Sequence, residues 1–438
     1  MALSPGNRNI KHNDPIMTKN KTLFPFILIT SLFFLWGFAH NLDPILIPHL
    51  KKSFTLTTVQ ATLVDSAVFI AYFLMALPAG FIMKKYGYKT GIITGLLIFA
   101  FGSYLFIPAA NTQQYTFFLV ALFIIACGLT ILETAANPYA SSLGDPATST
   151  QRLNFAQSFN GLAATLAPII GGRIILTKGY TAAQLGTMTE EGRKLALAAE
   201  ASSVKMPYFI LGSVLVIIAI IFAFTRLPKI QQHEEHTASK NIFHALKHRH
   251  LAWGVAAQFF YVGAQVCVFS LFILYATKSA SLTEVQATYY LGLCGAAFLI
   301  GRFIGTFLMR YYSSAGLLAA YGGINILLCT IAIFSHGMIT VYTVMGICFF
   351  MSIMFPTIFA LGIKDLKADT EFGSSLIIMS IVGGAVLPRI FGYISDVTGN
   401  IQYGYVVPLV CFAVVTFFGL KGHRVKVKPE NVSVAAIL

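Results

Sequence analysis

The chain has 438 residues, of which 56% are hydrophobic and only 11% are charged. A soluble domain would carry about 25% charged residues, so the composition excludes one and predicts an integral membrane protein. The formal charge of +14 does not indicate a nucleic-acid partner, because the Lys and Arg residues lie in short loops and tails rather than on one basic face.

Residues 1–22 are polar and lack a periodic apolar pattern, which predicts a disordered cytoplasmic tail. After this tail, twelve apolar segments are long enough to cross a bilayer at ~20 residues per crossing. These segments are residues 24–48, 57–83, 90–109, 115–141, 153–176, 207–226, 251–277, 285–309, 315–335, 338–362, 373–395 and 402–420. The first segment is too long for the apolar part of a cleaved signal peptide, so we expect it to remain in the protein.

The longest cytoplasmic loop, residues 227–250, separates the sixth segment from the seventh. It divides the chain into an N-terminal six-helix bundle, residues 23–226, and a C-terminal six-helix bundle, residues 251–421, with a cytoplasmic tail at 422–438. The expected fold is therefore an all-α integral membrane protein, with twelve transmembrane helices in two pseudo-symmetric six-helix bundles.

The two halves carry traces of a repeat. Pro138 and Gly144 in the N-terminal half have counterparts in Pro356 and Gly362, which follow 218 residues later. Many secondary transporters are built from such a repeat and hold the substrate between the halves near the middle of the membrane. The sequence therefore favours a transporter.

The distribution of basic residues predicts the orientation. With both termini in the cytoplasm, the cytoplasmic segments hold 20 Lys and Arg residues and the opposite side holds seven. Positive residues are enriched in cytoplasmic loops. We therefore expect a multi-pass protein of a bacterial plasma (inner) membrane, surrounded by the lipid bilayer, with both termini inside.

Two segments near the N-terminus carry ionisable groups where hydrocarbon is expected. His40 and Asp43 lie three residues apart in the first segment and could form a proton relay, although a packing role for His40 is favoured over the relay. We also consider His40 and its neighbour Asn41 as substrate-binding candidates. In the fourth segment stands Glu133, and burying its charge would cost several kcal/mol, so we expect it to face a wet cavity, to be protonated or to have a partner.

Asn137 lies four residues after Glu133 and shares its helix face, so the two groups could hold a polyol together. The alternative for Glu133 is a hydrogen bond that only fixes the packing of a neighbouring helix. Because burial disfavours the charged form of a carboxyl group, we expect Glu133 to bind a proton readily.

Amide side chains recur on two further segments. Asn154, Gln157 and Asn160 follow each other at three-residue spacing on the fifth segment, and Gln258, Tyr261 and Gln265 form a similar stripe on the seventh. Amides supply the donors and acceptors that sugar hydroxyls need. The alternative is hydrogen bonding between helices, which contributes about 1 kcal/mol per bond.

Three other features bear on the chemistry. Arg302 lies inside the eighth segment, and we expect a buried arginine to need a counter-ion. All six cysteines fall inside apolar segments without metal-type spacing, so we interpret them as buried thiols. The sequence indicates neither a metal site nor a cofactor.

Several longer runs resemble a known family. They are Ser31-Leu32-Phe33-Phe34-Leu35-Trp36, Ile45-Leu46-Ile47-Pro48, Pro78-Ala79-Gly80, Met83-Lys84-Lys85, Leu132-Glu133-Thr134-Ala135-Ala136-Asn137-Pro138, Gln258-Phe259-Phe260-Tyr261-Val262-Gly263-Ala264-Gln265, Ile300-Gly301-Arg302-Phe303, Phe355-Pro356-Thr357-Ile358-Phe359, Leu361-Gly362-Ile363-Lys364 and Phe372-Gly373-Ser374-Ser375. These runs resemble the proton-coupled L-fucose permeases and their glucose/galactose-transporting relatives, within the major facilitator superfamily. The resemblance covers nearly all of residues 24–419.

The resemblance implies an alternating-access fold, a monosaccharide substrate and symport driven by protons. It also implies two membrane-embedded acids, of which the one on the fourth segment corresponds to Glu133. In that family the acid on the first segment directly precedes the Ile-Leu stretch, where this chain has Pro44. Asp43 stands one position earlier, which is about 100° around a helix. Glu133 and Asp43 are therefore the candidate proton-coupling residues.

We expect a carrier that imports a monosaccharide of the L-fucose, galactose or glucose type and acts as a monomer. In this hypothesis protonated Glu133 binds the sugar from outside, together with a set of polar cavity residues. These are Asn137, Gln157, Asn160, Gln258 and Gln265. After the site opens inward and the sugar leaves, loss of the proton resets the carrier.

Several alternatives remain open at this point. Asp43 could hold the proton while Glu133 couples it to the sugar, and sodium could replace the proton. A drug or cation exporter of the same superfamily is a further possibility, although the amide stripes argue against it. An enzyme has no support, since no nucleophile, metal cluster or phosphate loop is evident.

Overall fold

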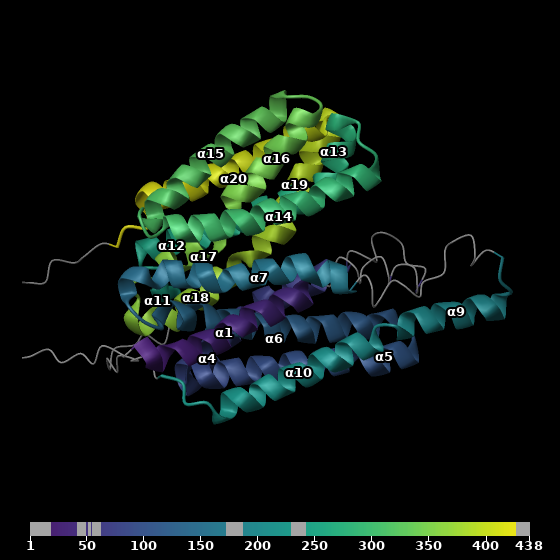
Figure 1. The fold of residues 1–438 in the computed structure, drawn as a ribbon, viewed down its shortest axis with the longest axis horizontal. Coiled ribbons are helices and arrows are strands. Elements are labelled where there is room, and N and C mark those ends of the chain that lie inside the picture. Colours follow the sequence, from purple (N-terminus) through teal and green to yellow (C-terminus); the bar gives the residue numbers. More distant parts are fainter. Residues whose placement is uncertain are drawn as a thin grey trace, which may run out of the picture.

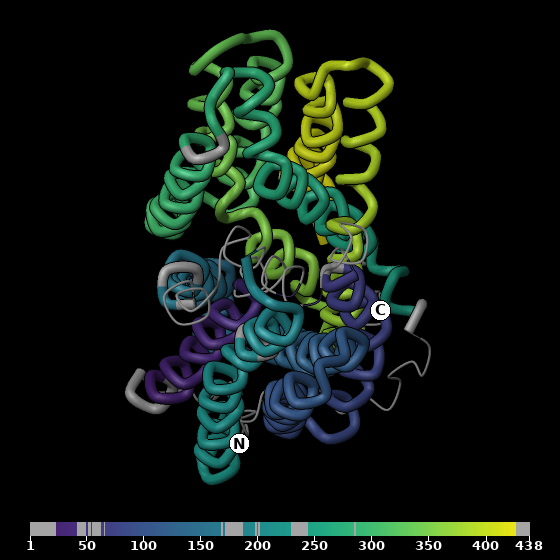
Figure 2. The backbone as a smooth tube through the Cα atoms, turned by 90° about the vertical axis from the view of Figure 1, so that its right-hand side faces the viewer, coloured from purple at the N-terminus to yellow at the C-terminus, as the bar shows by residue number. Residues whose placement is uncertain are grey.

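The structure is a computed structural model that describes residues 19–41, 50, 54, 63–171, 187–228 and 242–425. Every regular element within these ranges is a helix. Figures 1 and 2 show two bundles side by side, one coloured mainly purple to teal and the other mainly green to yellow. The predicted fold class is confirmed.

The N-terminal bundle begins with α1. Its elements are α1 (Lys19–His40), α4 (Leu63–Tyr104), α5 (Phe106–Thr112), α6 (Tyr115–Ser142), η1 (Pro146–Thr148), α7 (Ser149–Gly171), α9 (Glu190–Ser202) and α10 (Lys205–Phe224). The described part of the second predicted segment and most of the third lie in α4, which turns at Gly87, where φ is 82°. Glycine adopts this left-handed conformation without steric cost, so α4 is two crossings joined by a tight turn.

The C-terminal bundle follows the same plan with more interruptions. Its elements are α11 (Ile242–Ala245), α12 (Arg249–Ser270), α13 (Phe272–Ala280), α14 (Glu284–Leu308), α15 (Ser314–Phe334), α16 (Met338–Met351), α17 (Met354–Gly362), η3 (Lys367–Asp369), α18 (Thr370–Met379), η4 (Ser380–Val382), α19 (Gly383–Thr398), η5 (Ile401–Tyr405), α20 (Val406–Phe417) and η6 (Phe418–Gly422). The tenth predicted segment is broken between α16 and α17, close to Pro356.

Ten helical stretches in the described residues are long and apolar enough to cross a membrane. They include one run from Ser66 to Thr112 that contains two predicted segments, and they leave out α7. α7 is more polar than its neighbours because it carries Asn154, Gln157 and Asn160. Each of the twelve predicted segments therefore has a helical counterpart.

Close packing of α4 against α6 fixes the position of α6. A Cβ atom at Gly128 would lie 2.5 Å from the backbone nitrogen of Phe99, and a Cβ atom at Gly102 would lie 2.7 Å from the backbone nitrogen of Ile125. Small residues let membrane helices approach to backbone contact. The glycines therefore hold α6 tightly against α4.

The two bundles close on each other where α18 meets the middle of α4. The rings of Phe81 and Phe372 lie 5.0 Å apart, and the Lys84 ammonium lies 4.3 Å from the centre of the Phe372 ring. Tyr88 hydrogen-bonds the buried Glu371. Figure 1 shows the bundles together at this end, where α7 begins, and further apart toward α13.

The glycine contact in α6 predicts the outcome of adding one methyl group. Gly128→Ala forces the Cβ atom into the α4 backbone, and overpacking of this kind costs about 1–3 kcal/mol. We expect a lower apparent unfolding temperature for the purified protein in detergent. Gly323→Ala in α15 is the control, because a Cβ atom there meets nothing within 4 Å. Equal effects of the two substitutions would contradict the packing argument.

Candidate functional site

Glu133 lies in the most enclosed part of α6. Every residue from Gly128 to Ser141 is buried, and Glu133 itself is only 8% exposed. Its Oε2 atom forms no hydrogen bond, and no cation pairs with Glu133 among the described residues. The carboxyl group is therefore surrounded by protein rather than lipid, and an arginine does not hold it.

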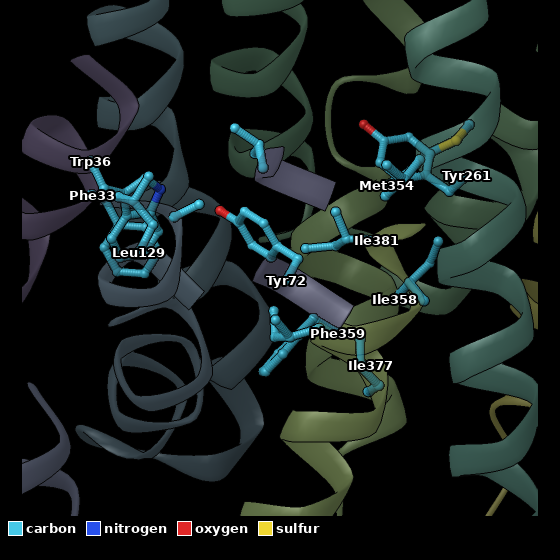
Figure 3. Close-up of a cluster of buried hydrophobic side chains, with 14 of the residues drawn as sticks. Phe33, Trp36, Tyr72, Leu129, Tyr261, Met354, Ile358, Phe359, Ile377 and Ile381 are labelled. Atoms are coloured by element: carbon cyan, nitrogen blue, oxygen red, sulfur yellow. The ribbon is translucent and has the colours of Figure 1, made fainter. Parts of the chain in front are cut away.

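Tyr72 of α4 is the hydrogen-bonding neighbour of the Glu133 side chain. Figure 3 shows Tyr72 between two groups of buried side chains. Phe33, Trp36 and Leu129 of the N-terminal half lie on one side, and Phe359 and Ile381 of the C-terminal half lie on the other. Tyr72 thus places the neighbourhood of Glu133 at the boundary between the halves.

Asn137 connects the backbone of α6 at Glu133 to α7. Its Nδ2 atom donates to the backbone oxygen of Glu133 at 2.9 Å, and its Oδ1 atom accepts from Nε2 of Gln157 at 3.0 Å. Asn137 and Gln157 are both buried. Three of the predicted site residues therefore form one hydrogen-bonded unit.

The unit continues into the C-terminal half through Arg302. The buried guanidinium donates from Nη1 to the backbone oxygen of Gln157 at 2.8 Å and from Nε to the backbone oxygen of Ser352 at 2.8 Å. Within the described part of the chain the hydrogen-bonding partners of Arg302 are carbonyl oxygens, and its need for a counter-ion stays a prediction.

The sequence explains why the Ser352 carbonyl is available to Arg302. Pro356 has no N–H group and cannot donate to the carbonyl four residues earlier, which is that of Ser352. The helix breaks here, between α16 and α17. A Cβ atom at Gly301 would lie 2.9 Å from Oγ of Ser352, so the glycine allows α14 to bring Arg302 to this carbonyl.

Two further hydrogen bonds join α7 to the C-terminal half. Nδ2 of Asn154 donates to Oγ1 of Thr357 at 3.1 Å, and Nε2 of Gln151 donates to the backbone oxygen of Thr306 at 3.4 Å. Asn154 therefore bonds between helices, one of the two roles considered for the amide stripe. Gln157, one turn further along, belongs to the Glu133 unit.

Gln258 and Tyr261 of α12 carry buried polar atoms without protein partners. Both amide atoms of Gln258 and the hydroxyl of Tyr261 form no hydrogen bond, although both residues are fully buried. The Tyr261 ring packs edge-on against Phe355 with the ring centres 6.4 Å apart, and Tyr261 lies within electrostatic range of Arg302. Buried polar groups are nearly always hydrogen-bonded, so these atoms are suited to a polar ligand.

The other predicted residues lie around this centre or apart from it. Asn160 packs against Gly37 of α1, where an added Cβ atom would lie 2.9 Å from Cα of Asn160. Gln265 is half-buried on α12. Nδ2 of Asn41 donates to the backbone oxygen of Gly37 in its own helix at 2.6 Å.

His40 lines a pocket of about 10 Å³ within the N-terminal half, together with Leu122 and Leu129. The part of α6 that reaches this pocket precedes Glu133. Asp43 lies outside the described residues.

Three contributors to the site were not assigned a site role from the sequence. Tyr72 contacts Glu133, Arg302 joins the halves, and the buried indole nitrogen of Trp36 forms no hydrogen bond. One sequence feature could have indicated Arg302, namely that it is a single arginine inside an apolar segment. Tyr72 and Trp36 resemble ordinary membrane aromatics, and only the tertiary contacts distinguish them.

The arrangement is suited to binding and proton exchange rather than to bond breaking. A buried carboxyl group, amides and a phenol can grip hydroxyl groups and hold a proton. No group of three or more His, Cys, Asp or Glu residues suited to a metal occurs among the described residues. This set of side chains is a candidate ligand-binding site of a membrane carrier.

Comparisons with known proteins agree with this class. Residues 26–370 match the model of the Major Facilitator Superfamily. The chain is 42% identical over 404 residues to the L-fucose-proton symporter of Escherichia coli K12, covering 90% of this chain and 92% of that protein. It is 39% identical over 426 residues to the glucose/galactose transporter of Brucella abortus, covering 97% and 100%.

Solved structures also place the chain near major facilitator transporters. A crystal structure of the major facilitator transporter FucP in the outward conformation superposes with a TM-score of 0.85 at 41% identity, covering 91% of this chain and 98% of that one. A bacterial ferroportin homologue shares only the fold, with a TM-score of 0.66 at 13% identity. The chain belongs to the major facilitator superfamily, and it is a transporter rather than an enzyme.

The link between Arg302 and Pro356 makes a testable prediction. Arg302→Met leaves the buried Ser352 carbonyl without its donor, at about 1–3 kcal/mol for an unsatisfied group, so the apparent unfolding temperature should fall. Adding Pro356→Ala supplies an N–H group for the Ser352 carbonyl, so the double variant should lose less than the sum of the single variants. Strictly additive losses would contradict this assignment. Arg389→Met, at an exposed arginine of α19, is the control.

Proposed function

We propose that this protein imports a monosaccharide of the L-fucose, galactose or glucose type by proton symport with alternating access. The observation that carries the proposal is the Glu133 carboxyl group, which is buried beside the boundary between the halves and has an oxygen without a partner. Relatives named as an L-fucose-proton symporter and a glucose/galactose transporter support this substrate class.

The sugar site in this proposal lies between Glu133 and α12. Asn137 and Gln157 face it from the N-terminal half, while Gln258 and Tyr261 face it from the C-terminal half. Gln258 and Tyr261 offer three buried polar atoms without protein partners, and sugar hydroxyls both donate and accept hydrogen bonds. Asn160, Gln265, His40 and Asn41 remain candidates for the outer part of the site.

Protonation of Glu133 is the coupling event in this proposal. A charged carboxylate in an apolar surrounding is costly, so a protonated Glu133 allows the halves to close over the sugar. Asp43 remains the candidate for a second proton site. The same proposal divides the chain at residues 227–250 into two six-helix bundles. In it the protein acts as a monomer.

The orientation in this proposal places both termini on the cytoplasmic side of the bacterial inner membrane. The contacts of Phe81 and Lys84 with Phe372 then close the cytoplasmic end. The structure would thus represent the outward-facing state of the cycle. The larger share of basic residues on this side supports the orientation.

Glu133→Gln tests the coupling role in sealed proteoliposomes. We expect accumulation of labelled sugar driven by an imposed pH gradient to vanish, because glutamine cannot release a proton, while exchange of internal for external sugar persists. Glu190→Gln, at an exposed carboxylate of α9, is the control and should accumulate sugar as the unchanged protein does. Accumulation that survives Glu133→Gln would exclude Glu133 as the coupling residue.

The same vesicles separate the competing functions. A panel of labelled L-fucose, D-galactose and D-glucose is offered under a pH gradient or a sodium gradient. The proposal expects uptake of at least one sugar under the pH gradient alone. Uptake that requires the sodium gradient would show that sodium, rather than the proton, is the coupling ion. The absence of uptake for every sugar would favour an exporter.

Gln258→Leu should move stability and binding in opposite directions. Removing a buried amide without partners raises the apparent unfolding temperature, while loss of its hydrogen bonds to the sugar weakens binding about tenfold. Gln402→Leu is the matched control, since Nε2 of this buried glutamine donates to the backbone oxygens of Ala332 and Ser335. It should lower stability and leave sugar binding unchanged. Isothermal titration and thermal unfolding in detergent measure both effects, and unchanged binding in Gln258→Leu would refute the ligand role.

A further inference from the structure

A recess lies away from the proposed sugar site, on the side of the molecule where the two bundles touch. It has a volume of about 420 Å³ and lies between the beginning of α7 and the end of α14. Figure 1 shows these two helices next to each other along the boundary of the bundles. The recess therefore lies at one end of the membrane-crossing helices and is lined by both halves.

One part of the lining is aromatic and exposed. Phe155 of α7 is 40% exposed, and Phe303 and Phe307 of α14 are 43% and 51% exposed. Phe155 also stacks on Phe26 of α1, with the ring centres 6.2 Å apart. Such side chains in a membrane-spanning helix face acyl chains, so this part of the recess suits hydrocarbon.

The other part of the lining is cationic. Arg310 is exposed and lies over the Phe307 ring at 5.5 Å, and its guanidinium has neither a hydrogen bond nor a carboxylate partner in the described part of the chain. Arg152 donates from Nη1 to the backbone oxygen of Asp145 and to Oγ1 of Thr148, both at 2.6 Å. Its Nη2 atom donates to the backbone oxygen of Ser141, and its Nε atom is buried without a partner.

The nearest acid does not neutralise this pair. The Asp145 carboxylate caps the short η1 helix by accepting from the backbone nitrogen of Ala147 at 2.9 Å, and it lies beside Arg152. None of the described residues that line the recess is acidic. Two arginines against one nearby acid leave an excess positive charge, centred on Arg310.

We propose that this recess binds one anionic phospholipid, with its phosphate held by Arg310 in the positive field of Arg152 and its acyl chains along Phe303, Phe307 and Phe155. Basic pockets between membrane helices suit such headgroups, and arginine suits phosphate because its planar guanidinium donates two parallel hydrogen bonds. The aromatic lining favours a lipid over a soluble phosphate, which has no acyl chain to bury.

The recess also links lipid binding to the state of the carrier. Its walls come from both halves, which are joined here by the hydrogen bond from Gln151 to Thr306. A ligand that contacts both walls binds only while they are together, so it favours the conformation in which this end is closed.

Native mass spectrometry of the full-length protein in detergent tests the proposal. Titration with dioleoyl phosphatidylglycerol should show one saturable lipid that binds about tenfold more tightly than dioleoyl phosphatidylcholine, as expected for a charge-assisted hydrogen bond. Arg310→Gln should abolish this preference and Arg310→Lys should retain most of it. Arg226→Gln, at an exposed arginine after α10 and outside the recess, should leave it unchanged.

Three results would overturn the proposal. The first is equal binding of the two lipids by the unchanged protein. The second is an equal loss of preference in Arg310→Gln and Arg226→Gln, which would indicate general attraction to positive charge. The third is displacement of the bound lipid by glycerol phosphate at concentrations comparable with those of the lipid, which would assign the recess to a soluble phosphate.

Discussion

The structure depends on the burial of one carboxyl group, Glu133, in the centre of a membrane protein. Hydrocarbon offers no hydrogen bonds, so a group of this kind is stable only where protein, water or a ligand supplies partners. Here α6 is enclosed along its length around Glu133, and Tyr72 contacts the side chain. One oxygen is left for a proton or a ligand, and the remaining architecture brings polar groups toward it.

α7 joins the α6 backbone at Glu133, through Asn137, to the opposite half. Along one stretch of the helix, Gln151 bonds Thr306, Asn154 bonds Thr357, and the Gln157 backbone oxygen accepts from Arg302. A typical hydrogen bond contributes a net of only about 0.5–1.5 kcal/mol. These bonds define the closed state without making it permanent, as rocking of two halves around a fixed site requires. Gln157 joins the candidate site to the contact between the halves. Its side chain donates to Asn137, and its backbone oxygen accepts from Arg302.

Helical periodicity makes the local part of the site predictable. Glu133 and Asn137 lie four residues apart on one helix face, and Gln157 belongs to a stripe of amides, so residue type and spacing are enough to indicate a polar face. The twelve crossings are predictable for the same reason, since length and hydropathy are local properties. The closing contacts between α4 and α18 join residues far apart in the chain, and no local pattern indicates them.

The contacts between helices in the site could not be predicted from the sequence. The partner of Arg302 is a carbonyl freed by Pro356, and neither residue indicates where the other lies in space. Likewise, Gln258 looked no different from Asn154, yet the first has no partner and the second bonds Thr357. The position of Asp43 lies outside the described residues, so its part in proton binding stays a prediction.

The most direct test of the central claim is the proton exchange that accompanies sugar binding to the purified protein in weakly buffered detergent solution. If a protonated Glu133 binds the sugar, adding a transported sugar at mildly alkaline pH must remove protons from the solution and raise its pH. The same addition to Glu133→Gln must leave the pH unchanged. Sugar binding without proton uptake at any pH, or equal uptake by the variant, would contradict the account.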